Sequence, residues 1–258
     1  MKIGLVGTLF GDRMEKFANN VPEAVLAKTL KRNGYEVLTF PMSEFPKKSV
    51  DVMHANHFGD ATYYLSLVKS SPLVFTPHNG FLICDFDIRE SVLDRVWRPL
   101  GFRRADVVVA TSRLEAQILQ RDYGIKPKKI VIIPNGIEAD SSSDRRLSGF
   151  ANAADRIRLL AIGQLETFKG YRYLLESMAQ IVPHYPDVEL VIVTHNPRLL
   201  SEYEHFCQEH HLEGHVHIEG AKTSDELWQY YSSCDIFVQP SLVENFSTTV
   251  LEAMACGV

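Results

Sequence analysis

Cysteine is scarce in this chain, and its cysteines form no short-spaced pair. The four residues, Cys84, Cys207, Cys234 and Cys256, are widely scattered and include no C-x-x-C pattern. A zinc ribbon, a redox motif or a disulfide framework would need closely spaced or abundant cysteines. The sequence therefore predicts none of these and fits a reducing cytoplasm.

Long apolar runs and an excess of basic charge are also missing. No run approaches the roughly 18 apolar residues of a membrane span, and the opening MKIGLVGTLF, interrupted by glycines, reads as a strand and not as a signal peptide. The formal net charge is -5, whereas a nucleic-acid-binding protein needs a clearly basic face. We therefore expect a cytoplasmic protein with no nucleic-acid partner.

What the chain does contain is a regular alternation of short β-branched runs with longer helical patterns. The predicted strands are KIGLVG, EVLTF, DVMHA, LVFTP, DVVVATS, KIVIIPNG, RLLAIG, VELVIVT, HVHIEG and DIFVQP. This alternation is typical of βαβ units and parallel sheets. The polar, Ser-rich stretch EADSSSDRRLSGFANAAD interrupts it as a linker does. The sequence predicts an α/β protein with two Rossmann-like domains, residues 1–140 and 156–258, joined by a linker at 141–155.

Helix starts are marked by capping signals. Ser112 with Glu115, and Thr223 with Glu226, each have the spacing of a capping box. Near the end of the chain, PSLVENFSTTVLEAMACGV predicts a helix that begins near Ser247.

Polar residues follow the strands of the second predicted domain, where parallel sheets bind ligands. They include GQLETFKG after the first strand and SLVE after the last. In the final stretch, Glu244 falls in the loop before the predicted helix, and Glu252 falls over a turn inside it. Between them, the N–H groups of Phe246, Ser247 and Thr248 would form a helix N-terminus, which favours phosphate. Two acids around a phosphate seat indicate contacts with ligand hydroxyls, because acids repel phosphate.

The motifs GQLETFKG and DIFVQPSLVENFSTTVLEAMACG together resemble the retaining glycosyltransferases of family 4, which have the GT-B fold of two facing Rossmann-like domains. The E-x7-E hallmark of that family is matched by Glu244 and Glu252. The stretches TPHNG and RADVVVATSRLEAQILQRDYGIKPKKIVIIPNGIE resemble its first domain. The resemblance covers nearly the whole chain, and its specificity lies in the combination of motifs.

The resemblance implies transfer of a sugar, with retention, from a UDP- or GDP-sugar to a saccharide or lipid-linked acceptor, without a metal or other cofactor. Glu252 would hold the ribose, Lys169 would neutralise the diphosphate, and Glu244 with the following amides would hold the donor sugar. His78 would face the donor sugar and the acceptor. The remaining implied site residues are Gly163, Gln164, Asn245, Phe246, Ser247 and Thr248 for the nucleotide sugar, and Gly7, Thr8 and Gly11 in an acceptor-side loop.

The chain departs from the family pattern at three places. Gln164 stands where the family usually has arginine, which would weaken donor binding by about an order of magnitude or more. Phe17 and Ala18 replace paired glycines before the first helix. Family members also continue beyond Val258, so the second domain is expected to be incomplete, with a tendency to self-associate.

Other readings of the sequence stay open. Asp85-Phe86-Asp87 has the D-x-D form of a metal motif, and the histidine-rich segment from His205 to His217 could suggest zinc, although a polar loop and surface histidines are the favoured interpretations. The arginine-rich pattern from Arg89 to Arg104 could contact a membrane or pack on its own sheet. For function, the alternatives are a catalytically impaired remnant that binds only a nucleotide or a partner, and a sugar-nucleotide epimerase.

Overall fold

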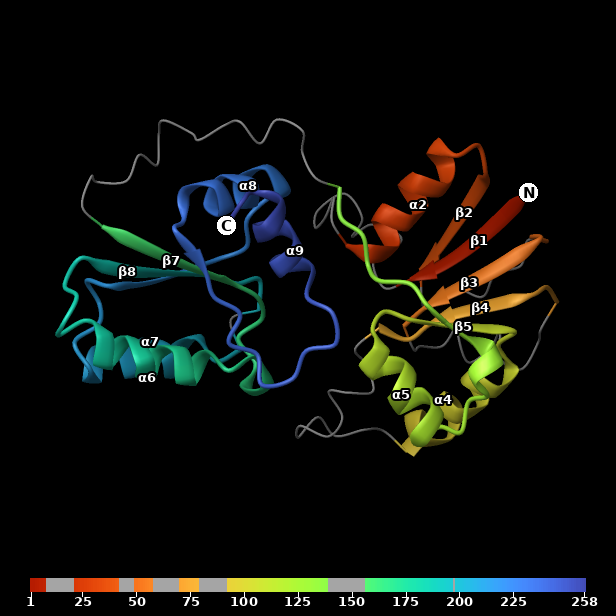
Figure 1. The fold of residues 1–258 in the computed structure, drawn as a ribbon, viewed down its shortest axis with the longest axis horizontal. Coiled ribbons are helices and arrows are strands. Elements are labelled where there is room, and N and C mark those ends of the chain that lie inside the picture. Colours follow the sequence, from red (N-terminus) through yellow and green to blue (C-terminus); the bar gives the residue numbers. More distant parts are fainter. Residues whose placement is uncertain (8–20, 42–48, 58–69, 79–91, 139–155, 197) are drawn as a thin grey trace. The chain divides into compact units, whose positions relative to one another are not determined.

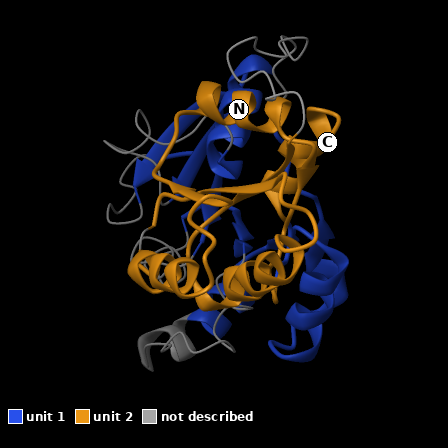
Figure 2. Cartoon of the chain, turned by 90° about the vertical axis from the view of Figure 1, so that its left-hand side faces the viewer, with its two compact units in different colours: residues 1–138, 244–246 blue, residues 139–243, 247–258 orange. Residues whose placement is uncertain are grey.

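A computed structural model describes residues 1–7, 21–41, 49–57, 70–78, 92–138, 156–196 and 198–258. It divides into two compact units (Figure 2), residues 1–138 with 244–246, and residues 139–243 with 247–258. The predicted domain limits at 140 and 155 fall on residues outside the described part of the chain.

The first unit is built on a parallel sheet with the strand order β2-β1-β3-β4-β5-β6. The strands are β1 (Lys2–Gly7), β2 (Glu36–Pro41), β3 (Val52–Asn56), β4 (Leu73–Thr76), β5 (Val107–Ala110) and β6 (Ile130–Ile132). The helices are α2 (Pro22–Arg32), α4 (Val92–Arg104) and α5 (Arg113–Arg121), and a 3-10 turn, η3 (Pro127–Lys129), precedes β6. In Figure 1, α2 lies beside β1 and β2, and α4 and α5 lie beside β4 and β5.

The second unit has a parallel sheet with the strand order β10-β7-β8-β9. The strands are β7 (Ile157–Ile162), β8 (Val188–Val193), β9 (Val216–Glu219) and β10 (Ile236–Phe237). The helices are α6 (Tyr171–Ile181), α7 (Leu200–Glu209), α8 (Ser224–Ser233) and α9 (Thr248–Ala255), and η4 (Thr167–Lys169) follows β7. Figure 1 shows α6 and α7 on one face of this sheet and α8 and α9 on the other.

Strand β8 is buried along its whole length, because both of its faces are covered. Leu190 and Ile192 point into a core with α6 and α7, whereas Val191 and Val193 pack with Tyr231 and other residues of α8 and α9. This period of two explains why VELVIVT is a nearly continuous apolar run. The predicted α/β architecture of two parallel-sheet domains is confirmed.

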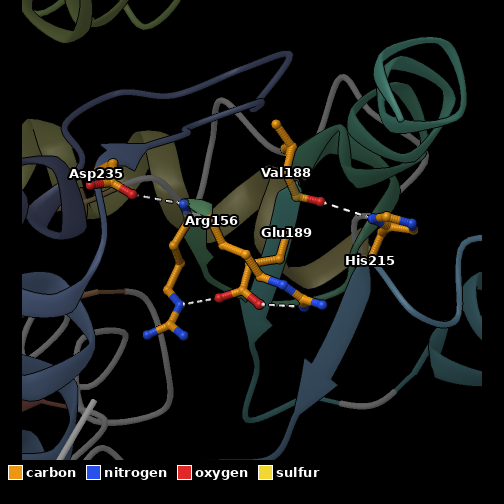
Figure 3. Close-up of polar contacts among 6 residues, drawn as sticks. Arg156, Val188, Glu189, His215 and Asp235 are labelled. Atoms are coloured by element: carbon orange, nitrogen blue, oxygen red, sulfur yellow. Dashed lines mark hydrogen bonds and ion pairs between the residues drawn. The ribbon is translucent and has the colours of Figure 1, made fainter. Parts of the chain in front are cut away.

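Polar contacts join the beginnings of the strands in the second sheet (Figure 3). The carboxylate of Asp235 accepts a hydrogen bond from the backbone N–H of Arg158 at 2.8 Å, and the Arg158 side chain donates to Glu189 at 2.5 Å. The Nδ1 atom of His215 lies 3.0 Å from the carbonyl oxygen of Val188. These contacts fix the strands at the end opposite to the loops that carry the predicted site.

The predicted helix caps are confirmed with one correction. Thr223 and Glu226 form a complete capping box, and Ser247 caps α9. Ser112 caps α5 by accepting from the N–H of Glu115, but the Glu115 carboxylate does not return the bond to Ser112. It accepts from the backbone N–H and the hydroxyl of Thr111 instead, because Glu115 is fully buried and lies against that residue.

Candidate functional site

The loops after β7 and β10 meet at the carboxyl-terminal edge of the second sheet. Leu242 donates its backbone N–H to the carbonyl oxygen of Phe168 at 2.9 Å. Gly170, at φ +72°, makes the approach possible, since a Cβ atom there would lie 2.0 Å from the carbonyl oxygen of Pro240. Lys169 is therefore carried by a turn that is joined to the segment leading toward α9.

The first loop also positions the other predicted donor-side residues. Gly163 follows β7 directly, and a Cβ atom at this position would lie 2.8 Å from the hydroxyl of Tyr171. Gln164 lies beside His195 at the end of β8, with 3.2 Å between Nε2 of the amide and Nε2 of the ring. Burial lowers the pKa of His195. The side chain of Gln164 is uncharged. Its neighbour, His195, is a histidine whose protonation is disfavoured.

The N-terminus of α9 is held by a glutamine that the sequence did not single out. Gln239 accepts from Ser247 at 3.3 Å and from Thr249 at 3.1 Å, and it donates to Ser241 at 2.6 Å. The Ser247 hydroxyl also accepts from the N–H of Val250 at 3.3 Å. The amide thereby connects the start of the loop after β10 with the first turn of the helix. Its only sequence signal was its place at the end of a predicted strand.

Glu252 lies in the second turn of α9, as predicted, and its side chain is buried. The hydroxyl of Tyr231, on α8, donates to its Oε2 atom at 2.6 Å. Burial of Tyr231, and then the adjacent Glu252 carboxylate, raise the pKa of the tyrosine far above its ordinary value. The hydroxyl therefore stays protonated and serves as a permanent donor to Glu252. No signal in the sequence indicated this contact for Tyr231.

Residues 244–246 belong to the first compact unit. Within that unit the amide of Asn245 donates to the Thr111 hydroxyl at 2.7 Å and accepts from the Ser112 hydroxyl at 2.5 Å. The side chain of Asn245 is thus buried and engaged with the start of α5. Glu244 precedes the helix in the chain and Glu252 lies within it, which is the arrangement that the spacing predicts.

His78, also in the first unit, lies at the end of β4 and is buried. Its Nε2 atom lies 3.3 Å from Oδ1 of Asn56, and its ring stacks on that of His57. Burial, together with the neighbouring His57, lowers the pKa of His78 to about 3, so its ring is neutral. Gly7 is the last residue of β1, whereas Thr8 and Gly11 lie outside the described residues.

A mostly apolar pocket of about 270 Å³ adjoins His78 within the first unit. Most of its polar lining comes from the central strands and the residues that follow them, namely His54, Asn56, Thr76, His78 and Thr111, and Thr29 and Asn135 also contribute. Its apolar lining comes from Pro22, Val25 and Leu26 near the start of α2, and from Val109, Ile133 and Pro134. The pocket thus offers a few buried polar groups beside a hydrophobic wall.

Some of the alternative sequence motifs lie among the described residues, and others lie outside them. Asp85-Phe86-Asp87 lies outside the described residues, as do Phe17 and Ala18. In the histidine-rich segment, His205 pairs with Glu209, and the ring of His210 lies against that of Phe206. Of the arginines around α4, Arg98 is buried, whereas Arg103 and Arg104 are exposed.

Two family models match consecutive parts of the chain. Residues 42–141 match "Glycosyltransferase Family 4", and residues 146–258 match "Glycosyl transferases group 1". In the part of the chain that the structure describes, no helix is long and apolar enough to cross a membrane.

Comparison with individual proteins gives a consistent result. The chain is 28% identical over 185 residues to the mannosylfructose-phosphate synthase of Agrobacterium fabrum, covering 67% of this chain and 41% of that protein. It is 25% identical over 203 residues to a Campylobacter jejuni N-acetylgalactosaminyltransferase whose name specifies a diphospho-undecaprenol acceptor, covering 79% of this chain and 51% of that protein. The chain thus spans about half the length of the curated relatives that it matches.

Among solved structures, Anabaena HepE in complex with UDP and glucose matches with a TM-score of 0.73 and 19% identity, covering 100% of this chain and 79% of that one. At this identity the likeness shows the fold, which is the two-domain GT-B architecture. The two family models, matched over residues 42–141 and 146–258, show that the chain belongs to the family 4, group 1 glycosyltransferases.

Proposed function

We propose that this chain acts in a retaining glycosyltransferase, which moves a hexose from a nucleotide-sugar donor to a saccharide or lipid-linked acceptor. The observation that carries the proposal is the buried Glu252 carboxylate, which Tyr231 orients within a helix whose first turn is fixed by Gln239. An acid in such a place suits the vicinal hydroxyls of a ribose, because a carboxylate only accepts hydrogen bonds.

The diphosphate of the donor is proposed to bind Lys169 and the backbone N–H groups at the start of α9. Lys169 is carried on the turn that Gly170 joins to the β10 loop, and Ser247 and Thr248 begin the helix. A helix N-terminus and a lysine both stabilise negative charge, so the leaving diphosphate needs no metal ion. Gly163 allows close approach of the backbone, and Gln164 contributes an amide hydrogen bond in place of a guanidinium.

The donor sugar is proposed to contact Glu244 and the backbone and amide groups of Asn245 and Phe246. His78 would offer a neutral imidazole to a sugar hydroxyl, and Gly7, Thr8 and Gly11 would meet the acceptor. In the reaction, the acceptor oxygen bonds to the anomeric carbon while the bond from that carbon to the diphosphate breaks. The acceptor proton passes to the departing phosphate oxygen on the same face of the sugar, which gives retention.

Two features of the relatives support the choice of substrates. The solved HepE structure holds UDP and glucose, which favours a UDP-sugar donor. The Campylobacter relative is named for a lipid-linked acceptor, and the Agrobacterium relative for a phosphorylated disaccharide product. A lipid-linked acceptor would place the enzyme at the cytoplasmic surface of a membrane, with the basic end of α4 as a candidate contact.

Incubation with a panel of UDP- and GDP-sugars tests the proposal. Donor binding measured by calorimetry, together with slow release of nucleotide, supports a transferase. Interconversion of the sugars would instead support an epimerase. Binding without turnover would support a remnant that only holds nucleotide, the alternative that Gln164 motivates. Loss of binding in Glu252→Ala is expected, and its persistence would contradict the proposed ribose contact.

A further inference from the structure

Three side chains in the first unit converge into a cluster, of which the proposed transfer reaction uses only one. Glu23 comes from the first turn of α2, His57 directly follows β3, and His78 follows β4. One potential ligand atom from each lies within 4.8 Å of the other two. Glu23 is fully buried, His78 is almost so, and His57 is partly exposed. A buried carboxylate requires a counter-charge, which a protonated His57 or a bound cation can supply.

The distance between Glu23 and His57 has the value expected for two ligands of one ion. Oε1 of Glu23 lies 3.6 Å from Nε2 of His57. This separation is also that of an ion pair between the carboxylate and a protonated ring. Two ligands at roughly 2.0 to 2.1 Å from a tetrahedral zinc ion are about 3.4 Å apart. The two atoms are therefore spaced as a shared cation requires.

The ring of His78 already has a hydrogen-bond partner for one of its nitrogens, Asn56, as the ring of a metal-binding histidine usually does. Asn56 donates its Nδ2 to the carbonyl oxygen of Val6 at 3.2 Å, which fixes the orientation of the amide. Its Oδ1 then faces Nε2 of His78 at 3.3 Å and accepts the ring N–H. In this tautomer the lone pair of His78 is on Nδ1. Metal-binding histidines generally donate their other ring nitrogen in this way, which fixes both the ring and its tautomer.

The backbone at both histidines is also unusual. His57 and His78 have φ values of 64° and 52°, in the left-handed region that residues other than glycine rarely adopt. Such conformations persist where the surrounding structure maintains them, often at functional sites. The two rings stack with centroids 4.4 Å apart. Uptake of an ion would therefore turn at least one ring about its terminal torsion, which is soft for histidine.

We propose that Glu23, His57 and His78 bind one divalent zinc ion and leave its fourth position open for water or another ligand. Imidazole and carboxylate ligands suit zinc, and three protein ligands with one open position are a common arrangement. The proposal does not rest on the proposed function. It has one consequence for it, since zinc on Nδ1 and Asn56 on Nε2 would leave His78 no nitrogen for a sugar hydroxyl. Zinc would then inhibit transfer.

The test uses the full chain after treatment with a chelator. Titration with zinc by calorimetry should give one ion per chain. Glu23→Gln keeps the shape and removes the charge, and His57→Asn keeps a residue that tolerates positive φ. Each should weaken zinc binding at least tenfold while circular dichroism shows a folded chain. The matched control is His205→Gln, which removes an exposed histidine paired with Glu209 at 3.3 Å and should leave the affinity unchanged.

Cobalt gives a readout that needs no variant. Bound in this site, cobalt should show the intense visible absorption of a four-coordinate ion. The proposal is overturned if the wild-type chain gives only the weak spectrum of six-coordinate cobalt, or if zinc binds it no more tightly than it binds Glu23→Gln. It is equally overturned if His205→Gln abolishes binding, because the ion would then be held by surface histidines.

Discussion

Tyr231→Phe removes a single hydroxyl from the second unit, and its consequences can be worked out from one contact. That hydroxyl donates to the buried Glu252 carboxylate at 2.6 Å. A hydrogen bond to a charged group contributes about 1.5 to 3 kcal/mol. A folded chain with a buried carboxylate that has lost this donor should therefore be less stable by about that amount, measured by urea unfolding.

The same substitution should reduce affinity for a nucleotide if Glu252 holds the ribose. Loss of the hydrogen bond destabilises both the free chain and its complex with UDP, so only part of its free energy appears in binding. We therefore expect UDP to bind about tenfold more weakly, equivalent to about 1.4 kcal/mol. A UDP analogue that lacks both ribose hydroxyls should bind the wild type and Tyr231→Phe about equally, because it makes no contact with the carboxylate. Calorimetry gives the affinity of each protein for UDP and for the analogue. A change in the ratio of these affinities in Tyr231→Phe shows that the hydroxyl orients Glu252, whereas a general loss of stability would leave the ratio unchanged.

The neighbouring tyrosine provides a matched control. The Tyr230 hydroxyl also donates to an acid, Glu219, on β9. Tyr230→Phe removes the same atoms from the same helix and should leave nucleotide affinity unchanged. Equal effects of the two substitutions on UDP affinity would refute the reasoning, and so would an unchanged ratio of UDP to analogue affinity in Tyr231→Phe.

Three further predictions concern the fold and the diphosphate contacts. Gln164→Arg restores a cation after β7 and should tighten UDP binding about tenfold; calorimetry that shows equal or weaker binding contradicts the role given to this loop. Gly170→Ala places a methyl group 2.0 Å from the carbonyl oxygen of Pro240 at φ +72°, so we expect a loss of about 1 to 3 kcal/mol in urea unfolding and weaker donor binding. For Glu189, burial raises the pKa, but the hydrogen bonds and charges of Arg158 and Arg156 together outweigh it and leave the pKa below its ordinary value of 4.5. The ion pair should therefore stabilise the chain fully above about pH 4.5 and lose this contribution as the pH falls through the lowered pKa. The stability difference between wild type and Glu189→Gln should shrink accordingly, and a difference that grows on acidification would contradict this.

The strand positions follow from signals that act locally. VELVIVT is apolar on both faces because β8 lies between β7 and β9 and is covered by helices on either side. The α9 cap at Ser247 was likewise predictable, because a hydroxyl before a helical run satisfies free N–H groups. Local chemistry was sufficient to predict these two features.

The sequence could not show contacts between residues that are distant in the chain. Tyr231 and Glu252 are 21 residues apart, and their pairing depends on the packing of α8 against α9. Glu23, His57 and His78 come from three separate segments whose convergence requires the sheet order β1-β3-β4. The departure at Ser112 has a similar cause, since burial directed the Glu115 carboxylate to Thr111. The contacts that the sequence did not predict are therefore those that tertiary packing determines.

The central claim is that this chain binds a nucleotide sugar through Glu252. Its most direct measurement is calorimetric titration of the wild type and Glu252→Ala with UDP and a panel of UDP- and GDP-sugars. The account predicts saturable binding of at least one nucleotide by the wild type and its loss in Glu252→Ala. Absence of binding to the folded wild type, or equal binding by both proteins, would contradict it.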